Sequence, residues 1–116
     1  MEKIYKIFYV SKAQIPNHDC AEMIANQSSI NNSALSITGI LFYDGEHFCQ
    51  HIEGEKENVD FLFDKIQKDD RHKELLVMEK GFIGDRKYEE WNMKYQELPD
   101  GTVLLCDLNY IKNLIK

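Results

Sequence analysis

Four positions in the sequence combine residue types that could act together on one ligand. Tyr9 stands near the end of an apolar segment, the pair Asn31-Asn32 follows a helical segment, and Gln50 lies within a later apolar segment. The single tryptophan is Trp91. Together Tyr9, Asn32 and Gln50 offer one phenol, two amide donor pairs and two amide acceptors. This set suits a planar heterocycle that carries alternating acceptors and donors along one edge.

Each of these positions also has an ordinary structural interpretation. Tyr9 and Trp91 could be plain core aromatics, and Asn32 could belong to a turn. Gln50 could be a solvated strand residue, because a neutral amide is expensive to bury without hydrogen-bond partners. His51, which follows Gln50, is expected at the solvent edge, with a tuning role beside Gln50 as the alternative.

The elements that must position these residues follow from the spacing of apolar side chains. Residues 3–10 predict a central strand, because apolar residues fall on both of its faces. Asp19 is suited to cap a helix that carries Met23 and Ile24 on a narrow apolar stripe. We expect this helix to give way to a turn over residues 28–33, whose polar side chains compete for backbone hydrogen bonds.

The rest of the chain continues the alternation of strands and helices. Asp44-Gly45 is a strong turn signal between two strands, and a second helix follows from Lys56 to about Asp69. Two more strands begin near Leu75 and Trp91, and a short terminal helix is expected over residues 104–115. The order βαββαββ predicts an α+β, ferredoxin-like fold, with both helices on one face of a mainly antiparallel sheet.

Length, composition and charge exclude several classes of protein. A chain of 116 residues, of which 43% are hydrophobic and 29% charged, is typical of one globular domain. Its net charge of −6 argues against nucleic acid as a partner, since that would require a basic surface. No segment has the roughly 18 apolar residues of a membrane span, and the N-terminus has no signal-peptide pattern.

The cysteines predict neither disulfides nor a metal site. Cys20, Cys49 and Cys106 are odd in number and lie far apart, without paired metal-ligand spacing. We also expect strand alternation to separate Cys49 from His47 and His51. A reduced, cytoplasmic protein without a bound metal is therefore the prediction.

Several segments together resemble the BLUF family, the blue-light sensors that use FAD. They occur in the family's order, with similar spacing, over about residues 3–98. Any one of them is weak evidence, but the whole set is specific and favours the ligand interpretation of Tyr9, Asn32 and Gln50. The matching segments are Phe8–Ala13, Ile30–Asn32, Ile37–Tyr43, Gly45–Gly54, Asp69–His72 and Trp91–Met93.

The resemblance implies a role for each matching residue. Tyr9 corresponds to the tyrosine that donates an electron and a proton to the excited flavin, and Gln50 to the glutamine that links this tyrosine to flavin N5 and O4. Asn32 corresponds to the asparagine that bonds the N3–H and O4 edge, and Asn31 to a polar neighbour along the flavin. The remaining implied residues are Ser11, Asp69, Arg71 and His72, which help to hold the flavin, and Trp91 and Met93, which relay the signal.

The implied mechanism is physically coherent. A phenol that is hydrogen-bonded to an amide can supply an electron and a proton together. The amide of Gln50 can then adopt another orientation or tautomer, and a stronger hydrogen bond at flavin O4 shifts the absorption to the red. A rearranged buried amide disturbs its neighbours, because a half-satisfied polar network is costly.

The sequence also departs from the family pattern. The family often has an arginine where this chain has Ser29, which removes a basic group near the outer end of the flavin. Lys12 is a candidate to replace it.

We expect a flavin-binding photosensor domain over residues 1–98 and a terminal turn and helix over residues 99–116. FAD is the expected cofactor, with FMN possible, and a homo-oligomer is possible. The expected output is signalling to a separate, unidentified protein if the chain is complete, or to an effector that has been cut away if it is not. The alternatives are a small flavin-dependent oxidoreductase, disfavoured by the lack of a Gly-rich phosphate loop, and an interaction domain without a cofactor.

Overall fold

The computed structural model describes residues 4–14, 18–88 and 93–97, and within α1 it describes the side chains of positions 23, 24, 26–28 and 30–34. Five strands form one sheet in the order β4-β1-β3-β2-β5. All neighbouring strands are antiparallel except β2 and β5, which are parallel. The elements are β1 (Tyr5–Ala13), α1 (His18–Ala34), β2 (Thr38–Tyr43), β3 (His47–Gly54), α2 (Lys56–Lys68), β4 (His72–Phe82) and β5 (Lys94–Glu97).

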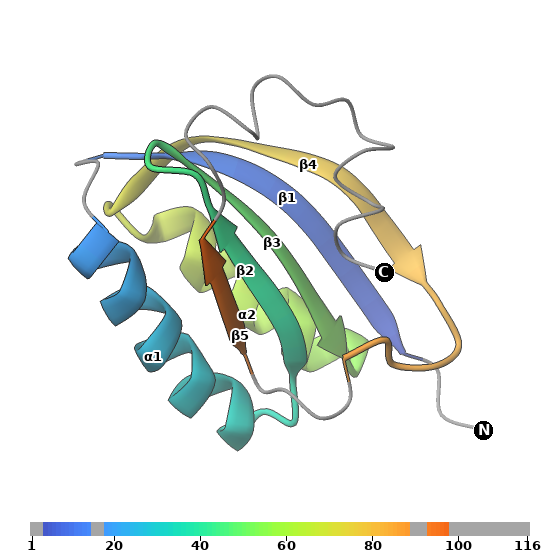
Figure 1. Ribbon diagram of the computed structural model, residues 1–116. Coiled ribbons are helices and arrows are strands. Elements are labelled where there is room, and N and C mark those ends of the chain that lie inside the picture. Colours follow the sequence, from blue (N-terminus) through green and yellow to red (C-terminus); the bar gives the residue numbers. More distant parts are fainter. Residues whose placement is uncertain (1–3, 15–17, 89–92, 98–116) are drawn as a thin grey trace.

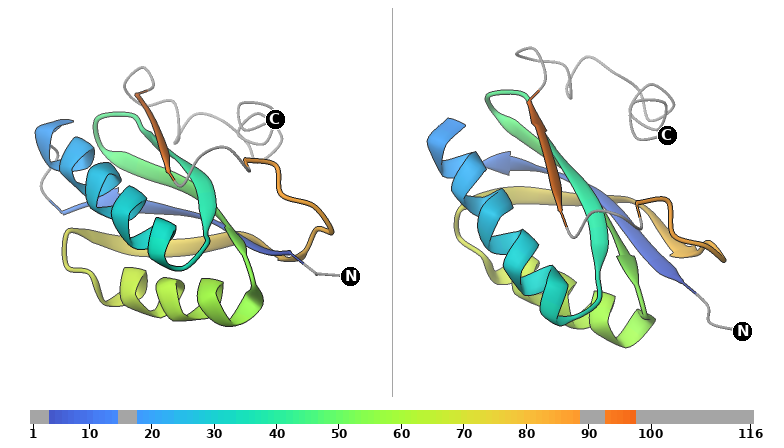
Figure 2. Two further views of the ribbon diagram at one scale, coloured as in Figure 1. Left: turned by 90° about the horizontal axis from the view of Figure 1, so that it is seen from below. Right: turned by 60° about the horizontal axis from the view of Figure 1, so that its bottom comes forward.

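Both helices lie on the same face of the sheet, side by side (Figures 1 and 2). The predicted α+β, ferredoxin-like arrangement is therefore confirmed. β1 is central and apolar on both faces, as its sequence predicted. On the helix side it contributes Tyr5, Ile7 and Tyr9, which pack with Val59 and Leu62 of α2.

The far face of the sheet has a core cluster of its own. Phe8 of β1 packs there with Phe42 of β2, Cys49 of β3 and Tyr88. The segment 83–88 thus covers part of the sheet that the helices leave open. Each strand in the middle of the sheet is consequently buried on both faces.

Local sequence explains the hairpin and α2. Asp44 Oδ1 accepts hydrogen bonds from the backbone N–H groups of Glu46 and His47 at 3.1 and 2.6 Å, and Gly45 adopts a positive φ of 91°. In α2 the residues Val59 and Leu62 are buried, as the helical spacing predicted.

The predicted end of the first helix is wrong. α1 continues through residues 28–33, which we expected to form a turn. Asn32 is fully buried near its end, and the backbone carbonyl of Asn32 accepts hydrogen bonds from the N–H groups of Leu35 and Ile37 at 3.1 and 2.8 Å. Burial of this helix face against the sheet outweighs the weak local preference of Ser and Asn for turns.

Two expectations for β3 are also wrong. His51 is buried on the far face instead of lying at the solvent edge, and its ring meets Tyr88 edge-on at 5.1 Å. Strand alternation does not separate Cys49 from the histidines, since residues two apart in a strand share a face. Even so, the described residues contain no group of three or more His, Cys, Asp or Glu side chains that could hold a metal ion.

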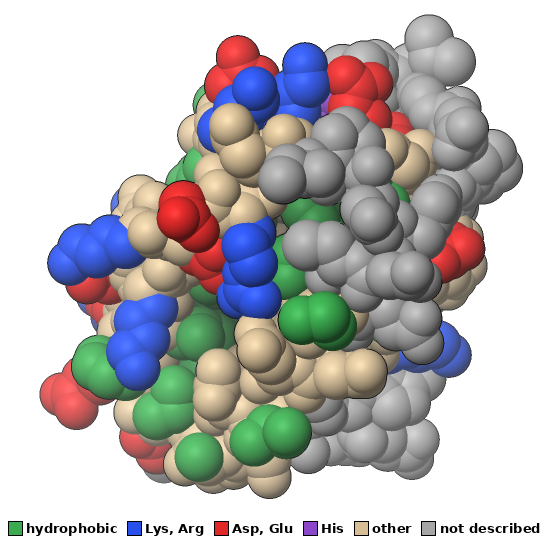
Figure 3. Space-filling model, turned by 90° about the vertical axis from the view of Figure 1, so that its left-hand side faces the viewer, with side chains coloured by type: hydrophobic (Ala, Val, Ile, Leu, Met, Phe, Trp, Pro, Cys, Tyr) green, Lys and Arg blue, Asp and Glu red, His purple; other side chains and the backbone are tan. Residues whose placement is uncertain are grey.

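The surface around α1 is mixed in character. Acidic and basic side chains lie next to each other, with hydrophobic side chains between them (Figure 3). Met23 and Ile30 on α1 are among the exposed large apolar residues. Neither described helix is both long and apolar enough to cross a membrane.

Candidate flavin-binding site

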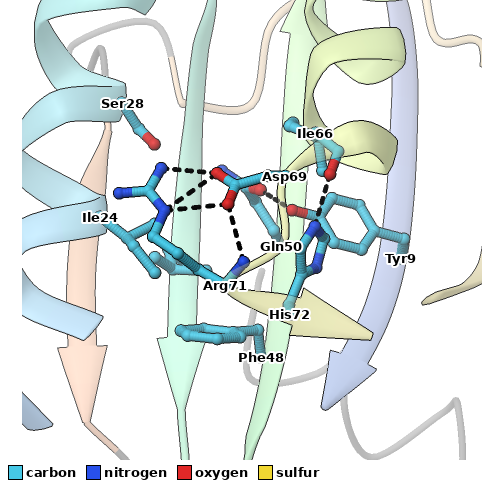
Figure 4. Close-up of a pocket in the computed structure, with 10 residues that line it drawn as sticks. Tyr9, Ile24, Ser28, Phe48, Gln50, Ile66, Asp69, Arg71 and His72 are labelled. Carbon is cyan, nitrogen blue, oxygen red and sulfur yellow. Dashed lines mark hydrogen bonds and ion pairs between the residues drawn. The ribbon is translucent and has the colours of Figure 1, made fainter. Parts of the chain in front are cut away.

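A pocket opens between α1, α2 and the helix side of the sheet (Figure 4). The empty space within it is about 380 Å³, including space that is open to solvent. Its walls combine apolar side chains with polar and charged ones. The lining residues are Tyr9, Ile24, Ser28, Leu41, Phe48, Gln50, Ile66, Asp69, Arg71 and His72.

Tyr9 and Gln50 face each other across the β1–β3 pairing. The register places Tyr9 directly opposite Gln50, and both side chains point to the helix side. The Tyr9 hydroxyl donates a hydrogen bond to Gln50 Oε1, and Gln50 Nε2 donates to Met93 Sδ at 3.6 Å. In this orientation the amide oxygen faces Tyr9 and the amide nitrogen faces Met93.

Both members of this pair are almost completely buried, with exposed fractions of 3%. Burial raises the pKa of the Tyr9 phenol far above its usual value, and electrostatic interactions with Cys49 and Asp69 raise it further. Tyr9 therefore keeps its proton over the physiological pH range.

His72 stands at the start of β4 and is held from both sides. Its Nε2 donates to the backbone carbonyl of Ile66 at 2.5 Å, so its Nδ1 accepts from the Ser11 hydroxyl at 2.7 Å in the neutral ring. Its ring also packs against Tyr9, with centroids 6.3 Å apart. Ser11 does not line the pocket; its contact with the site is through His72.

Arg71 and Asp69 form the charged edge of the pocket. The guanidinium donates to both carboxylate oxygens of Asp69, with Nη2 2.5 Å from Oδ2, and to Gln27 Oε1 of α1 at 2.7 Å. The hydrogen bonds from Arg71 lower the pKa of Asp69 and outweigh the effect of its partial burial. Arg71 thus joins the α2–β4 connection to α1 across the mouth of the site.

One face of α1 completes the pocket. Ile24 and Ser28 line it, and Asn32 follows at the same four-residue spacing, which places the three on one side of the helix. Asn32 is buried, but it is not among the lining residues. Asn31 is exposed and does not line the pocket, so its place along a ligand stays a prediction.

Five lining residues were not predicted as part of the site: Ile24, Ser28, Leu41, Phe48 and Ile66. The four-residue spacing of Ile24, Ser28 and Asn32 was the available signal, and the expected turn at Ser28 obscured it. Lys12 pairs with Glu46 at 3.3 Å and does not line the pocket, so its role as the replacement basic group stays a prediction. Trp91 lies outside the described residues.

The donor set fits a flavin ring. Ile24 from α1 and Ile66 from α2 give the pocket apolar walls from two helices, as a flat aromatic ligand requires. Gln50 and Tyr9 present an amide and a phenol at the floor, where ring nitrogen and oxygen atoms need partners. Arg71, paired with Asp69, adds guanidinium N–H groups at the edge of the pocket.

Comparison with known proteins agrees with this chemistry. The family model described as "Sensors of blue-light using FAD" matches residues 4–94. The photoactivated adenylate cyclase subunit alpha of Euglena gracilis is 35% identical over 103 residues, which is 86% of this chain. The matched region is 10% of that protein, so this chain spans only a small part of the curated relatives.

Solved structures show the same likeness. The BLUF protein BlrB in its dark state superposes with a TM-score of 0.77 at 30% identity, covering 98% of this chain and 85% of that one. A bacterial light-regulated adenylyl cyclase gives a TM-score of 0.79 at 34% identity, over 96% of this chain and 32% of that one. The chain therefore belongs to the BLUF family and is a blue-light sensor that uses FAD.

Proposed function

We propose that Tyr9 and Gln50 are the photoactive pair of this sensor. The observation that carries the proposal is the buried hydrogen bond from the Tyr9 hydroxyl to Gln50 Oε1, inside a pocket suited to the flavin ring. Bound FAD supplies absorption of blue light and an acceptor for one electron and one proton. Tyr9 is the side chain placed to release both, since its hydroxyl proton already lies against the amide.

The Gln50 amide is the switch in this proposal. Its oxygen faces Tyr9 and its nitrogen faces Met93, so a rotation or tautomerisation exchanges donor and acceptor at both positions. After that exchange the contact with Met93 changes, because a thioether accepts hydrogen bonds but donates none. The changed contact displaces Met93, which directly precedes β5.

Three other groups hold the cofactor. Arg71, oriented by Asp69, helps to hold the flavin at the mouth of the pocket. His72 is fixed by Ser11 and closes the side next to Tyr9. Asn32, buried on the pocket face of α1, bonds the polar edge of the ring.

We further propose that the output passes through β5 to another protein or domain, without catalytic turnover by the sensor itself. β5 is an edge strand, so it can move without breaking the antiparallel core of the sheet. Relatives that share this domain are adenylate cyclases by name. A flavin-dependent oxidoreductase is the alternative, and it predicts light-independent turnover with an electron donor.

The test is the visible spectrum of the protein purified in the dark, before and after blue light. The proposal predicts a yellow protein whose absorption shifts reversibly to the red. Gln50→Leu should retain flavin but lose the shift, whereas the control Gln67→Leu, at an exposed position of α2, should keep it. A normal red shift in Gln50→Leu would remove this residue from the mechanism, and bleaching with an added donor in the dark would favour the oxidoreductase.

A further inference from the structure

A carboxylate is buried on the face of the sheet opposite the flavin pocket. Glu53, near the end of β3, has an exposed fraction of 0%. Its Oε2 accepts hydrogen bonds from Thr38 Oγ1 at 2.7 Å and from the Tyr88 N–H at 2.9 Å. Its Oε1 accepts from the Lys87 N–H at 2.9 Å and from His51 Nε2 at 3.2 Å.

These contacts keep the side chain charged. Burial raises the pKa of Glu53, but the hydrogen bonds from His51, Thr38 and the two backbone amides outweigh it and leave the pKa below its usual value. A buried carboxylate with four hydrogen-bond donors holds those donors in fixed positions, because loss of any one of them leaves an uncompensated charge.

Arg86, which precedes Lys87, is also bound to the sheet beside Glu53. Arg86 Nη1 donates to Thr38 Oγ1 at 3.0 Å and to the backbone carbonyl of Glu53 at 3.2 Å. The Tyr88 ring is buried in the far-face core and lies edge-on to His51. Residues 86–88 are thus bound to β2 and β3 by side chains and backbone together.

The anchored segment leads directly to the proposed switch. Met93 follows Tyr88 by five positions, and its sulfur contacts Gln50 Nε2 on the helix side of the sheet. Five residues span at most roughly 18 Å when fully extended. The point at which the chain leaves the far face therefore restricts where Met93 can sit.

We propose that Glu53 is a positioning residue of the photosensor: by anchoring residues 86–88 to the far face, it sets the place at which Met93 meets the Gln50 amide. The inference rests on the proposed role of Gln50 as the switch. Glu53 touches neither the pocket nor its ligand. It acts through the segment that carries Met93 and β5.

The test replaces Glu53 with glutamine, which keeps the volume but puts an NH₂ group where one oxygen accepts two hydrogen bonds. The matched control is Glu57→Gln, an exposed carboxylate in the first turn of α2. In the flavin-loaded protein kept in the dark, amide hydrogen exchange over Lys94–Glu97 should become about tenfold faster in Glu53→Gln, as expected for one lost charge-assisted bond. The control should match the parent protein.

A second measurement separates positioning from a general loss of stability. Dark recovery after blue light should be at least about threefold faster in Glu53→Gln, because a displaced Met93 no longer restrains the Gln50 amide. In a Met93→Ala background the same substitution should change the recovery rate no further. An equal fold-change in both backgrounds, or unchanged exchange and recovery in Glu53→Gln, would overturn the proposal.

If Glu53→Gln fails to fold, Arg86→Gln takes its place. This substitution leaves the buried carboxylate and its four donors intact, and it removes the two hydrogen bonds from Arg86 to Thr38 and Glu53. It should give the same two changes in smaller measure, and parent-like values would again overturn the proposal. Failure of the underlying function is distinguishable, because in that case the parent protein itself would show no light-induced shift.

Discussion

The substitution Tyr9→Phe tests the proposed mechanism most directly, because it removes one hydroxyl and keeps the aromatic ring. The ring contacts with Phe63 and His72, at centroid distances of 5.6 and 6.3 Å, should persist. What is lost is the hydrogen bond to Gln50 Oε1, and with it the oxidisable phenol. The variant should remain folded and yellow, but it should form no stable red-shifted state.

The stability cost follows from burial. Gln50 Oε1 would lose its phenolic donor at a position with 3% exposure, and a buried acceptor without a partner costs about 1–3 kcal/mol. For a domain of this size, about 2 kcal/mol lowers Tm by roughly 6–12 °C. Thermal unfolding should be followed at saturating flavin, because unequal occupancy would shift Tm by itself.

The matched control is Tyr5→Phe, the same change four residues earlier on the same face of β1. Its hydroxyl is remote from Gln50 along the strand, so the light-induced shift should survive. Flavin fluorescence should increase in Tyr9→Phe and not in Tyr5→Phe, since phenylalanine is far harder to oxidise than tyrosine. A parent-like red shift with parent-like yield in Tyr9→Phe would refute the assignment of Tyr9 as the donor.

Three further predictions concern cofactor binding, pH and the sheet. Asn32→Ala should purify with markedly less flavin than the exposed-neighbour control Asn31→Ala, as measured by the ratio of visible to protein absorbance. Burial lowers the pKa of His51, so the unfolded state binds a proton first as the pH falls below about 6.5, and stability should decline there. Urea unfolding should show this decline in the parent protein and not in His51→Asn. Gly39→Ala should prevent folding, judged by circular dichroism, because the added Cβ would lie 2.0 Å from the backbone oxygen of His51.

Local sequence was sufficient wherever neighbouring residues determine the conformation. The Asp44-Gly45 turn and the buried spacing of α2 were predicted because hydrogen bonds and apolar contacts of that kind form within a few residues. Tyr9, Asn32 and Gln50 were recognised by their residue types and by the family resemblance. Their membership of a BLUF domain was thus determined by the sequence alone.

Only the tertiary structure decided how these residues meet. Tyr9 and Gln50 are 41 positions apart, and the β1–β3 register alone brings the hydroxyl to the amide oxygen. The spacing of apolar residues within either strand does not specify that pairing, since the register depends on both strands and on the faces that are buried.

The same reason explains the wrong predictions. The end of α1 and the burial of His51 depend on which part of the fold packs against each of them. Local conformational propensity carries no information about that packing. The role of Glu53 was likewise invisible, because two of its four donors are the backbone amides of residues 87 and 88, more than 30 positions away, and a third is Thr38 of β2. A buried carboxylate becomes recognisable only when the donors around it are in place, and the folded chain brings them there.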